Sequence, residues 1–132
     1  MKIVVKLAFL ILVISSFTFY TDQCIRKGVF TNSNDIETKG KVEVKVNKKG
    51  KAVIVLQNDF KTQEGPDLDV YLSTTPQVND SSLKVSKLWE LKGYQKFVST
   101  KSTDISVYHY VIIHCTQYNH WYGSAKLEDC SE

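Results

Sequence analysis

The sequence contains few residues that would interrupt or cross-link a chain: of 132 residues, two are proline and three are cysteine. No CxxCH motif is present, so there is no attachment site for a c-type haem. No long segment has the three- and four-residue apolar spacing of an amphipathic helix, which excludes a helical bundle. The unbroken apolar run at 7–14 holds eight residues, far fewer than the roughly 20 that a membrane-spanning helix needs.

The first 21 residues have the pattern of a secretory signal peptide. Lys2 and Lys6 precede an unbroken apolar run from Leu7 to Ile14. The uncharged span 7–21 holds only 15 residues, which favours a cleaved signal over an N-terminal membrane anchor. We expect cleavage between residues 18 and 23, a mature domain over 22–132, and a secreted or extracytoplasmic location, in the periplasm or at a cell surface. The alternative of lipid attachment at Cys24 would tether the domain.

The charge of the mature domain gives no support for nucleic-acid binding. Loss of Lys2 and Lys6 lowers the number of basic residues from 17 to 15, against 14 acidic residues, so the net charge is about +1. Nucleic-acid binding requires a clustered basic surface. The one dense basic patch, residues 45–51, contains Asn47 and Gly50 and is typical of a solvated turn.

Three cysteines constrain the fold of a secreted domain, where cysteines tend to pair. Cys24 begins the mature domain and Cys130 nearly ends it, and the termini of compact domains often lie close together. We therefore predict a Cys24–Cys130 disulfide, worth about 4–5 kcal/mol in the chain-entropy model. This pairing leaves Cys115 as a free thiol.

The apolar pattern predicts an all-β fold, an antiparallel β-sandwich of about seven to nine short strands. Residues 41–46 alternate polar and apolar side chains, residues 51–57 form a continuous apolar run, and the turn at 47–50 joins them into a hairpin. The other expected strands lie at 25–30, 67–73, 87–90, 94–98, 108–116 and 120–127, with one helical turn at 104–107.

Residues 108–127 hold all three histidines and Cys115. On a regular strand at 108–116, Cys115 points to one face and His114 to the other, so the two cannot bind one metal ion or form a nucleophile–base pair. His109 lies roughly 20 Å along the strand from Cys115. His120 follows a turn and could approach Cys115. No third ligand is evident, so no metal site is predicted, and a haem or metal held by Cys115 and His120 stays an open alternative.

Two other groups of side chains are interpreted as structural. The acidic side chains nearest the strand at 67–73 suit a solvated sheet face better than a calcium site, because their spacing matches no dedicated loop; they are Asp59, Glu64, Asp67 and Asp69. The C-terminal aromatics suit cross-strand packing better than a binding platform or a path for electrons; they are Tyr108, Tyr110, Tyr118, Trp121 and Tyr122.

Several motifs in one order indicate a family. The segment Gly-Pro-Asp-Leu-Asp-Val-Tyr-Leu-Ser at 65–73, Gly-Tyr-Gln at 93–95 and the segments 111–118 and 122–127 resemble the DM-thirteen domain over about residues 27–127. The resemblance implies a secreted or surface-attached all-β domain with an extracellular redox role. It also implies that a nearly universal cysteine, matched by Cys115, acts as a thiol or as a cofactor ligand. His114 stands where the family usually has tryptophan, and His120 where an apolar residue is usual.

Two functional hypotheses follow. In the first, the chain is a single-domain secreted member of this family with an extracellular redox or electron-transfer role centred on Cys115. In the second, it is a non-catalytic extracellular binding module and Cys115 is a core residue, as free cysteines often are. In either case the expected partner is an extracellular or cell-surface protein of unknown identity, and membrane contact is expected only through the signal peptide or a lipid at Cys24. The sequence assigns no enzyme class.

Overall fold

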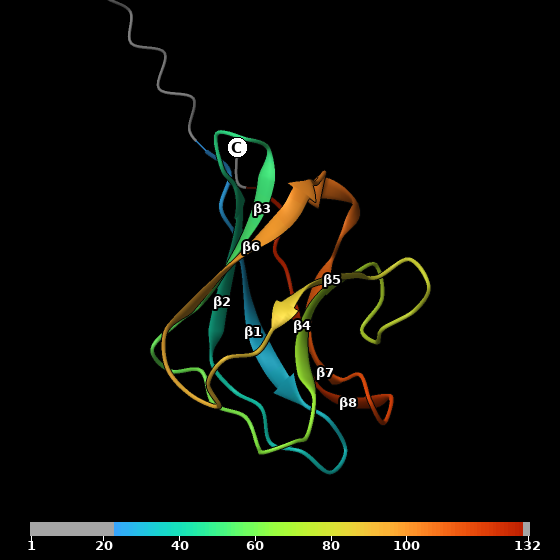
Figure 1. Ribbon diagram of the computed structural model, residues 1–132. Coiled ribbons are helices and arrows are strands. Elements are labelled where there is room, and N and C mark those ends of the chain that lie inside the picture. Colours follow the sequence, from blue (N-terminus) through green and yellow to red (C-terminus); the bar gives the residue numbers. More distant parts are fainter. Residues whose placement is uncertain (1–22, 131–132) are drawn as a thin grey trace, which may run out of the picture.

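The computed structural model describes residues 23–130 and consists of eight strands and one short 3-10 helix (Figure 1). The elements are β1 (Arg26–Asn32), β2 (Lys41–Val46), β3 (Lys51–Leu56), β4 (Leu68–Ser73), β5 (Leu83–Lys87), β6 (Gln95–Ser102), η1 (Ile105–Val107), β7 (Tyr110–Cys115) and β8 (His120–Lys126). The predicted signal peptide and its cleavage site lie outside the described residues. Within residues 23–130, no helix has the length and apolar character to cross a membrane.

The strands form one antiparallel sheet in the order β5-β4-β7-β8-β1-β2-β3-β6. The sheet curls until its two edge strands, β5 and β6, approach each other, so that its inner faces pack together in a nearly closed barrel (Figure 1). The predicted all-β, antiparallel, sandwich-like fold of seven to nine short strands is confirmed. The core is built from the inward apolar side chains of the strands, with Phe60 and Phe97 among the largest that are fully buried.

The predicted hairpin at 41–57 is confirmed as β2 and β3, with Val42 opposite Leu56 and Val46 opposite Ala52. Its turn needs Gly50, whose φ of 76° lies in the left-handed region that favours glycine. The helical turn at 104–107 is also confirmed, as η1. The Asp104 carboxylate caps it by accepting a hydrogen bond from the Ser106 N–H.

The expected strand at 87–90 is wrong. The strand is β5, at 83–87, and residues 88–94 form the connection to β6. Alternation along β5 is disturbed because its pairing with β4 shifts between Val70 and Tyr71, which breaks the apolar period that sequence reasoning relies on.

Strand β7 lies between β4 and β8 and is buried on both faces, as its apolar pattern predicts. Val111, Ile113 and Cys115 belong to the core inside the barrel. His114 is buried on the outer face, where it lies opposite Asp69 of β4 and Trp121 of β8.

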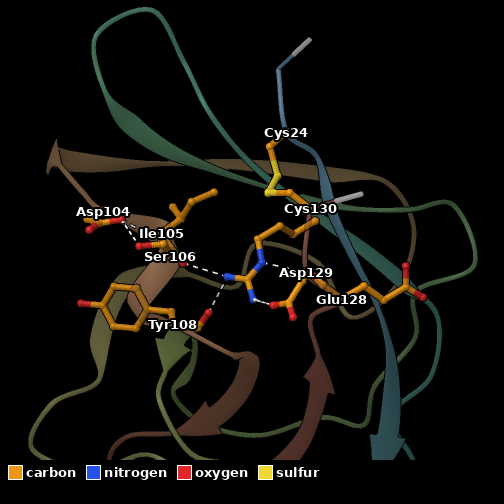
Figure 2. Close-up of a disulfide and its surroundings, with 9 residues drawn as sticks. Cys24, Asp104, Ile105, Ser106, Tyr108, Glu128, Asp129 and Cys130 are labelled. Atoms are coloured by element: carbon orange, nitrogen blue, oxygen red, sulfur yellow. Dashed lines mark hydrogen bonds and ion pairs between the residues drawn. A yellow bond between two sulfur atoms is a disulfide. The ribbon is translucent and has the colours of Figure 1, made fainter. Parts of the chain in front are cut away.

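One end of the barrel is closed by the predicted Cys24–Cys130 disulfide (Figure 2). Arg26, the first residue of β1, follows Cys24 by two residues, is 3% exposed and was not singled out by the sequence. Its guanidinium donates to the carbonyls of Ile105 at 2.8 Å, Tyr108 at 2.6 Å and Glu128 at 3.0 Å. Arg26 therefore joins the start of β1, the 3-10 helix and the C-terminal segment at this end.

Candidate functional site

The free thiol lies at the opposite end of the barrel, at the last residue of β7. Cys115 is 1% exposed and packs in the apolar core. It lies opposite Leu68 of β4 on one side and opposite His120 of β8 on the other. The prediction that Cys115 shares a face with Val111 and Ile113 is thus confirmed, and its sulfur is covered by the surrounding chain.

His120 lies beside Cys115 on the neighbouring strand, so the expectation that it could approach Cys115 is met. Directly opposed residues of two antiparallel strands share a face and have Cβ atoms about 4.5–5.5 Å apart. The His120 ring also contacts the ring of Tyr122, a core residue, edge to face at a centroid distance of 5.5 Å. No hydrogen bond joins the Cys115 sulfur to this ring among residues 23–130.

A carboxylate contacts the His120 ring. Asp35, in the loop after β1, places Oδ1 3.4 Å from Nε2 of His120. Cysteine, imidazole and carboxylate thus lie near one another at this end of the barrel, and these are the groups by which a base and its orienting group activate a thiol. Sequence reasoning missed Asp35 because it is 80 residues from Cys115 and belongs to no motif.

A short segment before β4 covers this end. The Tyr122 hydroxyl donates a 3.1 Å hydrogen bond to the Glu64 carbonyl. A Cβ atom on Gly65 would collide with the Tyr122 hydroxyl and approach Cδ2 of Leu68 to 2.9 Å, so only glycine fits here. We call residues 64–67 the cap. Burial raises the pKa of Tyr122, and negative charge at Cys115 and Asp35 raises it further.

On the outer face, Asp69 contradicts its interpretation as part of a solvated sheet face. It is fully buried, its carboxylate accepts a 2.5 Å hydrogen bond from the Thr116 hydroxyl, and Lys84 Nζ lies 3.1 Å away. Period-two alternation predicted its face correctly. It could not predict that the Lys84, Tyr71 and Thr116 side chains gather over that face.

His114 belongs to the same outer cluster. Its Nε2 lies 3.0 Å from Asn119 Oδ1, and its ring meets the Tyr71 ring edge to face. Burial lowers the pKa of His114, while Asn119 and the charge of Asp69 act in the opposite direction. The cluster is separated from Cys115 by the sheet itself, which confirms that His114 and Cys115 cannot act on one ligand.

The aromatic and acidic side chains that were interpreted as structural differ in how far they are buried. Tyr122 is buried and Tyr108, Tyr110 and Trp121 are half-buried, as packing residues would be, but Tyr118 is 68% exposed and packs little. Asp59 accepts a hydrogen bond from the Lys41 N–H, Asp67 pairs with Lys87, and Glu64 is exposed. No three acidic, histidine or cysteine side chains among the described residues are placed to hold a metal ion.

A haem does not fit against Cys115. The sulfur is enclosed by core side chains and the cap, where a single added methyl group on Gly65 would already collide with Tyr122. A macrocycle bound through the Cys115 sulfur would have to open the core. No step involving such a group is therefore derived.

Comparison with known families gives a match. A family model described as "Electron transfer DM13" matches residues 29–127. The chain belongs to the electron transfer DM13 family. The match is to the DM-thirteen family that the sequence motifs resemble, and it spans β1 to the residue after β8, including Cys115, His120 and the cap. Comparison with curated proteins and with solved structures found no match.

The DM13 description indicates an electron-transfer role. Within this DM13 domain, the Gly-Pro-Asp motif forms the cap above the buried cysteine, and its second aspartate, Asp69, is the buried carboxylate of the outer cluster.

Proposed function

We propose that this protein is a secreted electron-transfer domain in which Cys115 is the redox-active atom and works as a thiol. One observation carries the proposal. The cysteine that the disulfide leaves free lies opposite His120 on the neighbouring strand, and the His120 ring contacts Asp35, all at one end of the barrel beside the cap. The family description supports the electron-transfer role.

Thiol–disulfide exchange is the chemistry that this arrangement suits. When the cap opens, the Cys115 proton passes to His120 and the sulfur attacks a disulfide of a partner protein. The partner's S–S bond breaks, and its leaving sulfur takes the proton from His120. A thiol of a donor protein then attacks the partner's sulfur in the mixed disulfide, supplies a proton to the released Cys115 and forms a donor–partner disulfide. A second thiol of the donor attacks its own sulfur in that bond, which leaves a disulfide on the donor and releases the partner's second sulfur as a thiol with the second donor proton. Two electrons have then moved from the two donor thiols to the partner's disulfide, and Cys115 is unchanged.

The test is capture of the mixed disulfide. Native mature protein is incubated with an aromatic disulfide probe, and the product is identified by mass. We expect one probe half per chain on Cys115, none on Cys115→Ser, and a slower reaction with a flatter pH profile in His120→Gln. His109→Gln, which changes a histidine far from the thiol, is the matched control and should react as the wild type. Reaction only after denaturation would contradict the proposal.

A second function is favoured by the burial of Cys115, which is 1% exposed. In a non-catalytic binding module the cysteine only fills the core. Cys115→Ala would then cost about 1–3 kcal/mol of stability and leave the biological activity intact. The first proposal instead expects Cys115→Ala to abolish electron transfer even where the variant remains fully folded by circular dichroism.

A further inference from the structure

The connection between β5 and β6 exposes large apolar side chains. Within residues 88–94, Trp89 is 65% exposed, Tyr94 58% and Leu91 39%. Single exposed apolar side chains are common on protein surfaces, whereas a cluster of them often marks an interaction site. The cluster is also rich in the aromatic residues that dominate the energetics of protein interfaces.

This connection is rigid because a buried glutamine organises its backbone. Gln95, which is 4% exposed, accepts hydrogen bonds at Oε1 from the N–H groups of Glu90 at 2.9 Å and Trp89 at 3.2 Å. Its Nε2 donates to the Glu90 carbonyl at 2.9 Å. The apolar side chains are therefore exposed by a fixed backbone and not by fraying, which lowers the entropy lost on binding.

Backbone hydrogen bonds tie the same connection to the chain that leads into the cap. The Leu91 carbonyl accepts from the Thr62 N–H at 2.8 Å, and the Gly93 N–H donates to the Phe60 carbonyl at 2.9 Å. The Trp89 ring packs edge-on against the core residue Phe97 at a centroid distance of 5.0 Å while most of the residue faces solvent. Trp89 is thus anchored on one side and available on the other.

A pocket of about 370 Å³ lies between this connection and the cap, lined by residues 64–68 and 87–91. Its charge is predominantly negative. Lys87 pairs with Asp67 at 2.8 Å, and no ion pair within residues 23–130 engages Glu64 or Glu90. A basic side chain of a ligand would therefore find two free carboxylates beside an apolar surface.

We infer that Trp89, Leu91, Tyr94 and the adjoining pocket form the docking site for an extended segment of a partner protein. A lysine or arginine of that segment enters the pocket between Glu64 and Glu90, and a neighbouring apolar side chain packs on Trp89. The carboxylates and the aliphatic Leu91 favour such a peptide over a glycan. The inference rests on the proposed function in one respect, which is that the peptide belongs to the redox partner. The two sites adjoin, because Gly65 lines the pocket and is also part of the cap.

The experiment uses a displayed library of random peptides, selected on the mature domain carrying Cys115→Ser so that no thiol chemistry contributes. We expect enriched peptides to contain lysine or arginine next to a large apolar residue. Their affinity, measured by calorimetry, should fall at least tenfold in Trp89→Ala and severalfold in Glu90→Gln. Val29→Ala, which truncates an exposed apolar side chain on β1, is the matched control and should bind normally.

Failure to enrich such peptides, or enrichment of peptides whose affinity is unchanged by both Trp89→Ala and Glu90→Gln, overturns the inference. Glycan binding that is lost in Trp89→Ala would also overturn it in favour of a sugar site. Glu90→Gln is a surface change, so it decides the question even if Trp89→Ala perturbs packing on Phe97. Because Cys115 is absent from this experiment, its failure leaves the proposed thiol chemistry standing, and inertness of Cys115 leaves peptide binding standing.

Discussion

The two ends of the barrel are closed by different means. At one end, the Cys24–Cys130 disulfide and the three carbonyl bonds of Arg26 bind the chain termini and the 3-10 helix together. At the other end, Cys115 is buried beside the cap, which is held by noncovalent contacts: the Tyr122 hydroxyl donates to the Glu64 carbonyl, the Thr116 N–H donates to the Asp67 carbonyl at 3.0 Å, and Asp67 pairs with Lys87. Cross-links and multidentate bonds resist local opening, whereas a close-packed segment can open while the rest stays folded. The difference suggests a stable end and a working end.

The largest expected effect comes from removing the Cys24–Cys130 disulfide at the stable end. We expect Cys24→Ser with Cys130→Ser to lower the free energy of unfolding by about 4–5 kcal/mol, because the unfolded chain loses a loop constraint of about a hundred residues. Urea unfolding monitored by circular dichroism measures it. Wild-type protein under reducing conditions is the control. A loss below about 1 kcal/mol would show that this end is not secured by the disulfide.

The next test concerns the buried carboxylate near the working end. Asp69→Ala should cost about 2–3 kcal/mol, because it removes a buried carboxylate that accepts a hydrogen bond from the Thr116 hydroxyl and pairs with the partly exposed Lys84. Lys84→Ala, alone and combined with Asp69→Ala, completes a double-mutant cycle by urea unfolding. Additive effects of the two changes would contradict an ion pair between Asp69 and Lys84.

A smaller effect is expected at the cap. Gly65→Ala should cost about 1–3 kcal/mol, because the added methyl group collides with the Tyr122 hydroxyl and Leu68. It should also speed the reaction of Cys115 with a thiol reagent. Tyr122→Phe in the same chain removes the colliding hydroxyl and should recover part of the stability. If Gly65→Ala leaves both stability and thiol reactivity unchanged, the cap does not control access.

The smallest effect is a pH dependence on the outer face. Burial lowers the pKa of His114 in the folded state below its ordinary value of 6.5, so the unfolded chain binds the proton more readily. The stability that neutral His114 contributes is complete above pH 6.5, the ordinary pKa, and is lost as the pH falls from that value through the lower pKa of the folded state. His114→Gln should flatten this loss, measured as Tm between pH 5 and 8. The exposed His109→Gln serves as the control, and equal pH profiles in wild type and His114→Gln would contradict the assignment.

The sequence was sufficient for features that depend on local pattern or on chain ends. Alternation at 41–46 and 108–116 gave the β2–β3 hairpin, the central position of β7 and the opposite faces of Cys115 and His114. The position of the cysteines gave the disulfide. These signals are short-range, or follow from the closeness of chain termini in compact domains.

The sequence was insufficient where distant segments meet. Asp35 reaches His120 through the return of β1 beside β8, Arg26 bonds to carbonyls about 80 to 100 residues away, and the partners of the buried Asp69 carboxylate come from β5 and from the residue after β7. A pattern of period two tells which face a side chain occupies but not what covers that face. The register shift in β4–β5 likewise displaced one strand.

The most direct test of the account is the rate at which native Cys115 reacts with a small thiol reagent at increasing urea. If the working end opens locally, the free energy of exposing Cys115 will be several kcal/mol below that of global unfolding and will depend little on urea at low concentrations. If the exposure free energy equals the global value at every urea concentration, Cys115 is reached only by complete unfolding, and the proposed redox role of this end is contradicted.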